Sequence, residues 1–433
     1  MSQTFESLKF FNYRLWFSAN IVASTGMWMQ RVAQDWVVLT VLTSGSGTAI
    51  GITTALQFLP ILLFSAWAGV IVDRMDRRRI IQFTQGMTGL MSLILGVLLL
   101  TGTAQLWHVY VLAFLGGILS TVDAPARQTF VSQLVPLEFL PNAVGLNSAA
   151  FNVARLLGPA LAGLVIEWVG PGWVFIVNVM LFAAPVTAVA LMKTSLFTPT
   201  KFVKREKGQI REGIKYVLGR SDIIVIMVVA GVVSAFTMNF QMTSAVMATE
   251  VYGKGAGEYG MLGSVMAIGS LAGALLAARR KFPRVRLVIT SAFFFGIFNI
   301  LLGIAPTYEA FALLSIPTGL AMLTMITAAN AAIQISTDPM MRGRVMSLYL
   351  MVFMGSTPIG APIIGWIADE WGGPWSLAVG GISAIVVAVG AALWAIKSWD
   401  VRFETHWSSK KPITMYGPRE RARDLEAGDG PTD

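Results

Sequence analysis

The sequence predicts an all-α membrane protein with twelve transmembrane helices arranged as two pseudo-symmetric six-helix bundles. Hydrophobic residues make up 55% of the 433 residues and charged residues 13%, whereas about 25% of a soluble domain is charged. Apolar runs of roughly twenty residues recur along the chain, and each is long enough to cross about 30 Å of hydrocarbon. The two halves of the chain also resemble each other.

Apolar runs bounded by Gly, Pro and charge clusters place the helices. The first six are expected near residues 14–42, 48–72, 79–102, 105–126, 146–169 and 173–193. The second six are expected near residues 222–250, 257–279, 285–305, 309–335, 343–370 and 375–398. The chain therefore divides into bundle 1–193, central loop 194–221, bundle 222–399 and tail 400–433. We expect the charged tail to be disordered because it has few large apolar residues.

Basic residues indicate the orientation of the helices. All of the 32 Lys and Arg residues except Lys254, Arg31 and Arg155 lie on one side of the expected membrane. Because positive residues stay in the cytoplasm, both termini and the central loop are expected inside a plasma or inner membrane. An amphipathic stretch in that loop, with its apolar face formed by Ile210, Ile214, Val217 and Leu218, is expected on the inner membrane surface.

An internal repeat relates the two halves. GPALAGLVIEWVGPGW, from Gly158, aligns with GAPIIGWIADEWGGPW, from Gly360. This alignment pairs Glu167 with Asp369 and Gly170 with Gly372, and the same offset brings Arg77 and Arg78 onto Arg279 and Arg280. A duplication of this kind, with a binding site between the halves, is a recurring plan of transporters.

Several function classes are excluded by composition. The chain has no cysteine and two histidines, so thiolate or His-cluster metal sites and disulfides are not expected. A GxxxxGK[ST] loop is absent from the sequence, which argues against nucleotide hydrolysis. We therefore expect no enzyme activity, no metal and no cofactor. The net charge of +9 lies between spans and favours anionic lipid over nucleic acid as the partner.

Charged residues inside the membrane cost about 2.5 to 3.5 kcal/mol each and usually face a cavity and a partner. Polar residues recur every three or four positions in the first span, with Gln34 beside them: Asn20, Ser24, Met27, Arg31 and Asp35. A second stripe in the fifth span is formed by Ser148, Asn152 and Arg155. Burial favours a neutral aspartate and nearby arginine favours a charged one. Asp35, with Arg31 and Arg155, is thus the expected proton-coupling site; the alternative is a static ion pair that orients helices.

The expected substrate cavity is apolar and adaptable, because the chain has 22 Met and 25 Phe. Its expected lining combines both halves and consists of Met27, Gln34, Asn152, Met238, Gln241 and Thr327. Glu167 and Asp369, at the outer ends of repeat-related spans, are interpreted as solvated helix caps.

Two motifs carry a resemblance to a known family. GVIVDRMDRRRI matches a loop signature of roughly GxLaDRxGRRxxL through Gly69, Asp73, Arg74, Arg77 and Arg78, with Asp76 in place of a glycine. ARLLGPALAG resembles a fifth-span signature of about GxxxGPxxGG, with Ala154 and Ala162 replacing glycines. The chain thus resembles the major facilitator superfamily. STVDAPARQ and RGRVMSL are similar to its enterobactin-exporter-like and macrolide-efflux-like branch.

The resemblance implies a gate. Asp73 would face the start of the eleventh helix near Gly343, where a macrodipole favours an anion. Arg77, and Arg74 beside it, would bridge to Asp123; the alternative is that the cluster only keeps its loop inside. Further gating residues implied by the resemblance are Arg127, Gly158, Pro159 and Gly163, the last three allowing the fifth helix to bend or to pack against the other half. The fourth-span arginine of many drug–proton exporters has no counterpart in HVYVLAFLGG.

The sequence therefore predicts a secondary active transporter that exports lipophilic drugs or secondary metabolites, siderophores included, by proton-coupled alternating access. The expected partners are a small-molecule substrate, protons and membrane lipids, and the expected state is a monomer. Two alternatives are open: an importer or facilitator of a small solute, and a non-transporting membrane sensor or scaffold.

Overall fold

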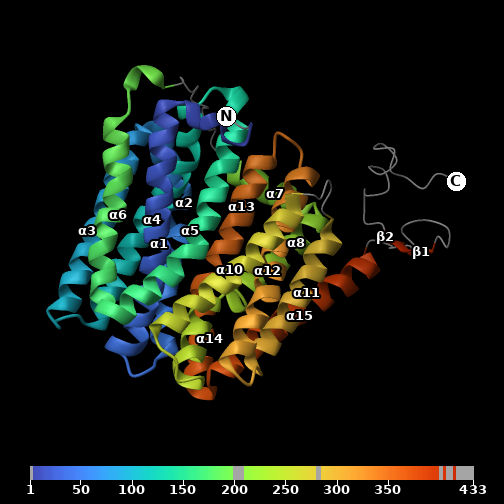
Figure 1. Ribbon diagram of the computed structural model, residues 1–433. Coiled ribbons are helices and arrows are strands. Elements are labelled where there is room, and N and C mark those ends of the chain that lie inside the picture. Colours follow the sequence, from blue (N-terminus) through green and yellow to red (C-terminus); the bar gives the residue numbers. More distant parts are fainter. Residues whose placement is uncertain (1–2, 198–208, 279–283, 399–402, 406–412, 416–433) are drawn as a thin grey trace.

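The computed structural model describes residues 3–197, 209–278, 284–398, 403–405 and 413–415. Long helices run side by side and form two halves that follow each other in the chain (Figure 1). The helices of the first half are α1 Phe11–Trp36, α2 Gly47–Arg74, α3 Arg77–Leu100, α4 Leu106–Leu134, α5 Leu140–Val169 and α6 Pro171–Leu191. The helices of the second half are α8 Ser221–Phe236, α9 Phe240–Val246, α10 Ala256–Ala278, α11 Val285–Gly303, α12 Tyr308–Ser336, α13 Arg342–Gly355, α14 Thr357–Trp371 and α15 Gly373–Ser398.

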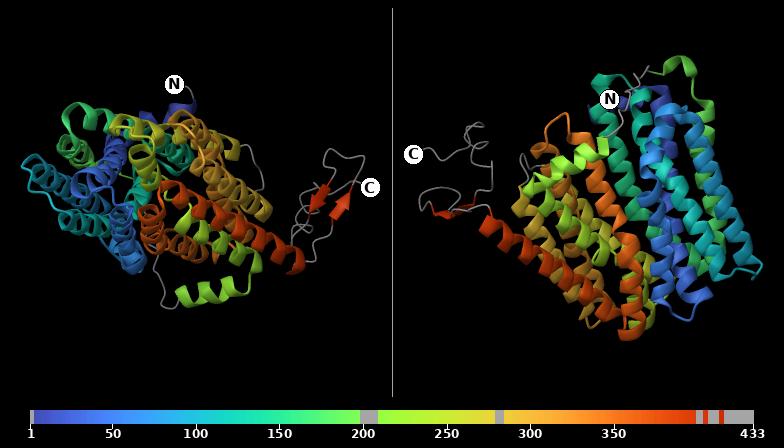
Figure 2. Two further views of the ribbon diagram at one scale, coloured as in Figure 1. Left: turned by 90° about the horizontal axis from the view of Figure 1, so that it is seen from below. Right: turned by 180° about the vertical axis from the view of Figure 1, so that it is seen from behind.

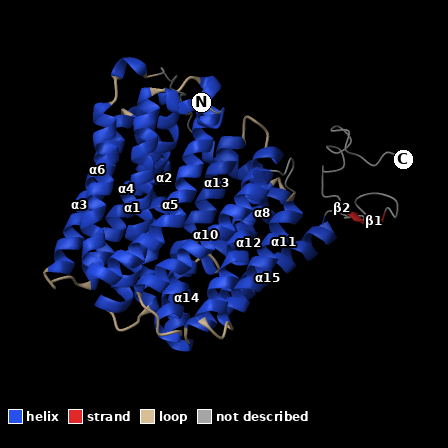
Figure 3. Ribbon diagram, viewed as in Figure 1, coloured by secondary structure: helices blue, strands red, loops and turns tan. Residues whose placement is uncertain are grey.

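Short elements connect or extend these helices. The 3-10 turns are η1 Gln3–Lys9, η3 Leu137–Phe139 and η4 Thr194–Leu196, and the π-helical segments are η2 Val37–Leu42 and η5 Met247–Val251. The helix α7 Gln209–Leu218 lies between the halves in sequence, and strands β1 Phe403–Thr405 and β2 Ile413–Met415 pair antiparallel in the tail. Figure 3 shows that helices make up almost all of the described chain.

The predicted membrane fold is confirmed. Within the described residues, 11 helical segments are long and apolar enough to cross a membrane. The helix outside that set is α1, whose polar stripe lowers its hydropathy although it packs against α5 and α6 like the other long helices. The eleven segments together with α1 correspond to the twelve predicted spans.

Two predicted spans are each broken into two helices. The seventh is interrupted at residues 237–239, where the side chain of Asn239 donates a hydrogen bond to the Ala235 carbonyl (2.8 Å). The eleventh is interrupted at Ser356, two residues before Pro358 in the first turn of α14. A proline fits the first turn of a helix, where its missing N–H costs nothing. Two helices, α4 and α5, are longer than predicted, since α4 ends at Leu134 and α5 begins at Leu140.

The two ends of the bundle differ in charge. We call the end with η1, Arg77 and α7 the basic end, at the top of Figure 1. The other end, which we call the far end, carries the turns at Gly170 and Gly372.

These two glycines are paired by the internal repeat, and their φ angles of 93° and 90° are nearly equal. The repeat is therefore reproduced in the backbone, and only glycine adopts such φ values without strain.

The helix α7 lies against the second half. Arg344 of α13 forms an ion pair with Glu212, and the amide of Asp338 donates to the Tyr216 hydroxyl (3.2 Å). Val217 is buried, whereas Ile214 and Leu218 are exposed. The predicted apolar face is thus divided between a protein contact and an exposed surface. Residues 198–208 of the predicted loop, most of the predicted disordered tail, and the repeat partners Arg279 and Arg280 lie outside the described residues.

Buried apolar residues form two cores. One is continuous from the second half into the far-end part of the first half, where it includes Val37, Ile166 and Phe175. The other is confined to the basic end of the first half, around Trp16 and Phe130. The views from below and behind in Figure 2 show the two halves as neighbouring groups of helices. The halves therefore share a core at the far end and not at the basic end.

Candidate transport site

The predicted charge cluster lies around one indole ring. The guanidinium carbon of Arg31, on α1, is 5.8 Å from the ring centroid of Trp28, and that of Arg155, on α5, is 5.6 Å from the same ring. Arg31 also lies over Phe58 of α2 at 5.2 Å. Side chains of three helices, α1, α2 and α5, therefore meet around the two arginines.

The carboxylate of the cluster is Asp35, which is 5% exposed. It interacts electrostatically with Arg31 and with Tyr259 of α10, in the other half. Tyr259 is 2% exposed, and its ring stacks on Trp36 with centroids 6.0 Å apart. Its hydroxyl approaches Asp35 without meeting hydrogen-bond geometry. The cluster thus includes side chains from both halves.

A direct ion pair between Arg31 and Asp35 is absent from the described contacts, although the two interact electrostatically. The static ion pair that orients helices stays an alternative prediction. The guanidinium is instead held by aromatic rings, an arrangement that leaves its N–H groups available.

The predicted substrate-binding residues have different environments. Gln34 is buried, and its amide nitrogen has no hydrogen-bond partner. Met27, on the same face of α1, is 40% exposed. Met238 lies in the break between α8 and α9, and Gln241 is on α9, which packs against α1 and α2. The break in the seventh span is therefore followed by a short helix, α9, that places Gln241 beside the first half.

Two predicted binding residues are satisfied within their own helices. The Asn152 side-chain amide donates to the Ser148 carbonyl (2.8 Å), and the Thr327 hydroxyl donates to the Leu323 carbonyl (2.8 Å). Hydroxyls that bond back to their own helix in this way are common in membrane helices. These two groups therefore contribute less to a polar binding surface than the sequence pattern suggests.

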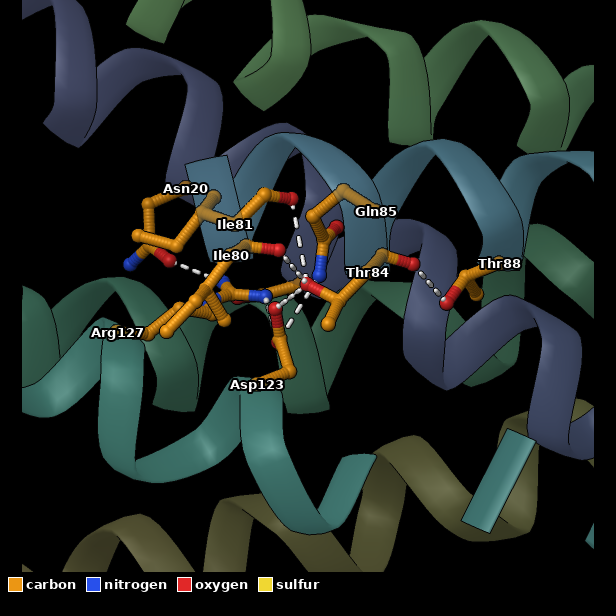
Figure 4. A network of polar contacts seen from close by, with 9 residues as sticks. Asn20, Ile80, Ile81, Thr84, Gln85, Thr88, Asp123 and Arg127 are labelled. Atoms are coloured by element: carbon orange, nitrogen blue, oxygen red, sulfur yellow. Dashed lines mark hydrogen bonds and ion pairs between the residues drawn. The ribbon is translucent and has the colours of Figure 1, made fainter. Parts of the chain in front are cut away.

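The rest of the α1 stripe belongs to a second network, shown in Figure 4. The carboxylate of Asp123, on α4, accepts hydrogen bonds from Thr84 (2.5 Å) and Gln85 (2.9 Å) of α3 and forms an ion pair with Arg127 (3.6 Å). Arg127 also donates to the Asn20 side chain on α1. The stripe that appeared continuous in the sequence is thus divided between two sites.

The loop signature is located at the basic end. Asp73 and Arg74 are in the last turn of α2, Gly69 lies one turn earlier, and Arg77 begins α3. Asp76, which replaces the usual glycine, caps α3 by accepting a hydrogen bond from the Arg78 amide (2.9 Å). Contacts of Asp73 with the start of α13, and of Arg74 or Arg77 with Asp123, stay predictions.

Two of the fifth-span residues that were predicted to act in gating contact the other half. A Cβ atom at Gly163 would lie 2.6 Å from the Ala256 carbonyl oxygen of α10, and Pro159 contacts Gly263 of that helix. Gly158 does not: a Cβ there would lie 2.5 Å from Cβ of Trp28, in the same half. Gly158 instead lets α1 place Trp28 near both arginines, and a role of this glycine in bending α5 stays a prediction.

The carboxylate of Asp369, interpreted from sequence as a solvated cap, joins the two halves. It accepts hydrogen bonds from the amides of Gly47 (2.5 Å) and Thr48 (2.9 Å) and from the Ser46 hydroxyl (3.0 Å), at the start of α2. Its repeat partner Glu167 lies against Gly257 at the start of α10. Each half thus directs an acidic side chain at a helix N-terminus of the other half.

Sequence reasoning missed Trp28, Phe58 and Tyr259. Trp28 was detectable, since it lies one turn before Arg31 on α1. Tyr259 and Phe58 had no such signal, because their position depends on how α10 and α2 pack against α1.

A paired-bundle membrane fold with a charged cluster between its halves defines a transporter of the major facilitator type. The chain belongs to the transmembrane secretion effector family, whose model matches residues 2–419. The predicted family, and the prediction of a transporter in place of an enzyme, are confirmed.

The sequence identity between this chain and individual relatives is low. The chain is 26% identical to a staphyloferrin A transporter of Staphylococcus aureus, over 87% of this chain and 94% of that protein. It is 25% identical to the multidrug efflux pump Tap of Mycobacterium tuberculosis, over 82% of this chain and 86% of that protein. A crystal structure of a D-xylose-proton symporter shares the fold, with a TM-score of 0.67 and 14% identity over 87% of this chain and 97% of the other.

Proposed function

We propose that the protein is a proton-coupled exporter of lipophilic or siderophore-type small molecules, acting by alternating access. The observation that supports this proposal best is the buried cluster of Asp35, Arg31 and Arg155, which reaches the other half through Tyr259. Relatives named as siderophore and multidrug transporters are consistent with export. We further propose that the basic end faces the cytoplasm, that the membrane is the cell membrane, and that the unit is a monomer.

Asp35 is the proposed proton site because its surroundings differ between states. In the closed arrangement, packing between the two halves separates Asp35 from water at the far end. Burial of this kind favours the neutral form of an aspartate. Rocking that separates α1 from α10 would remove Tyr259 and admit water, which favours the charged form beside Arg31. Proton occupancy and the direction of access are thereby linked.

The test uses Nile red, a neutral lipophilic dye, in cells with and without the protein. We expect lower dye accumulation in cells that contain the protein and loss of the difference after an uncoupler. Asp35→Asn should abolish uncoupler-sensitive efflux, whereas Glu138→Gln, which removes an exposed carboxylate, should leave it unchanged. Full proton-driven efflux by Asp35→Asn would exclude Asp35 as the coupling site, and protein-dependent uptake would favour an importer.

A further inference from the structure

The cluster around Trp28 has an excess of positive charge. Two guanidiniums, Arg31 and Arg155, approach the same ring and repel each other. Among the described residues, Asp35 is the carboxylate that interacts with Arg31. The nearby acids at the far end have other contacts, since Glu258 accepts from the Gly255 amide (3.1 Å) and Glu167 lies against Gly257. When Asp35 is ionised, one of the two guanidinium charges is therefore uncompensated. When Asp35 is neutral, both are.

The guanidiniums keep their hydrogen-bond donors. The guanidinium carbons of both arginines lie over the Trp28 ring, and that of Arg31 also lies over Phe58, so aromatic faces, and not hydrogen-bond acceptors of the described chain, surround the two groups. Among the described contacts, neither Arg31 nor Arg155 donates to a protein acceptor. A fork of N–H groups held in this way matches the two oxygens of a carboxylate.

Further donors without acceptors accompany them. The indole N–H of Trp28 and the amide nitrogen of Gln34 are buried and have no partner in the described chain, whereas the Tyr259 hydroxyl approaches Asp35. Trp28, Arg31, Gln34 and Asp35 follow at steps of one turn or less, so they share a face of α1. Buried polar groups in proteins nearly always have partners. The cluster thus contains mainly hydrogen-bond donors without acceptors, and a ligand that carries acceptors would complete it.

We infer that the substrate of the exporter proposed above is an amphipathic organic anion, whose carboxylate-type group binds between Arg31 and Arg155. The inference rests on the proposed function and narrows its substrate class. The apolar part of the anion lies against Trp28 and Phe58. A cation would be repelled by the two guanidiniums, and a neutral molecule would leave their excess charge without a partner.

The test measures binding to the purified full chain in detergent, through stabilisation against thermal unfolding. The probes are three molecules of the same shape that differ in charge: 1-naphthoate, 1-naphthamide and 1-naphthylmethylammonium. We expect 1-naphthoate to bind at least about 10-fold more tightly than either of the other two probes. Neither the amide nor the ammonium group can accept the pair of charge-assisted hydrogen bonds that the two oxygens of a carboxylate accept.

Variants locate the binding site. Arg155→Gln should weaken 1-naphthoate binding by about 10- to 100-fold, and Arg155→Lys, which keeps the charge and loses the fork, should bind with intermediate affinity. Arg14→Gln removes an exposed arginine of α1 that lies outside the cluster and should bind as the unchanged protein does. If Arg155→Gln fails to fold, the charge preference of the unchanged protein decides the question.

Equal or tighter binding of the amide or the ammonium probe would overturn the inference, as would unchanged 1-naphthoate affinity in Arg155→Gln. These results are separable from the proposed function. Uncoupler-sensitive Nile red efflux without any preference for 1-naphthoate contradicts the anion site alone. A clear preference for 1-naphthoate in binding, without uncoupler-sensitive efflux of either 1-naphthoate or Nile red, contradicts proton-coupled export alone.

Discussion

At the scale of single residues, Asp123 shows how the first half keeps an ionised group within its helices. Its side chain is 13% exposed and that of Arg127 is 18% exposed. Thr84, Gln85 and Arg127 together supply donors from two helices. A carboxylate in such surroundings is stable only when its oxygens are paired. The network therefore joins α3 to α4 and, through Asn20, to α1.

Removing the Asp123 charge should destabilise this half. We expect Asp123→Asn to lower the free energy of unfolding by about 1 to 3 kcal/mol, because Arg127 loses its charge partner. Thermal unfolding in detergent measures the change. In a double-mutant cycle with Thr84→Val the effects should be smaller than additive, since both changes disrupt one network. Strict additivity would show that the Thr84 hydrogen bond contributes independently.

At the scale of helices, glycines set how closely the halves approach. On α5, Gly163 lies against the backbone of α10, and the repeat-related Gly365 of α14 lies against Gly47 of α2. Both contacts are at the far end, and each is a helix pair formed between the halves. Small residues allow such backbone contact within a membrane. The far end is closed by two equivalent glycine contacts.

A side chain at Gly163 should prevent this closure. In Gly163→Val the new Cβ would lie 2.6 Å from the Ala256 carbonyl oxygen, so α5 and α10 must separate. We expect a longer distance between spin labels placed at the far ends of these two helices. The chain has no cysteine, so label sites can be introduced directly. Gly145→Val is the matched control on the same helix, because nothing lies within 4 Å of its Cβ. An unchanged distance in Gly163→Val would contradict the packing argument.

At the scale of the whole molecule, hydrophobic periodicity and the internal repeat were sufficient to predict twelve spans in two halves. The breaks at Asn239 and Ser356 were not predicted, because continuous apolar runs hide local changes in backbone hydrogen bonding. The Arg31, Asp35 and Arg155 cluster followed from helical spacing on α1 and α5. Tyr259 and the inter-half contacts of Asp369 could not be predicted, since they depend on how helices far apart in sequence are packed.

The contact of Asp369 with α2 gives the whole molecule a directional bias. An anion at a helix N-terminus is stabilised by unpaired amides and the macrodipole, by about 1 kcal/mol. This contact exists only while the far end is closed, so it stabilises that state relative to one in which α14 and α2 separate. Glu167, against the start of α10, occupies the equivalent position in the other half.

Neutralising Asp369 should therefore shift the equilibrium between states. We expect Asp369→Asn to raise the population open at the far end about fivefold, because a loss of about 1 kcal/mol changes an equilibrium by that factor. The readout is the rate at which a water-soluble maleimide labels a cysteine introduced at Ala368 of α14, a residue that lies against Gly47 of α2 and is 6% exposed in the closed contact. Glu370→Gln removes the neighbouring exposed carboxylate and should label at the original rate. If both variants label equally, the closed state depends on the glycine contacts and not on the charge of Asp369.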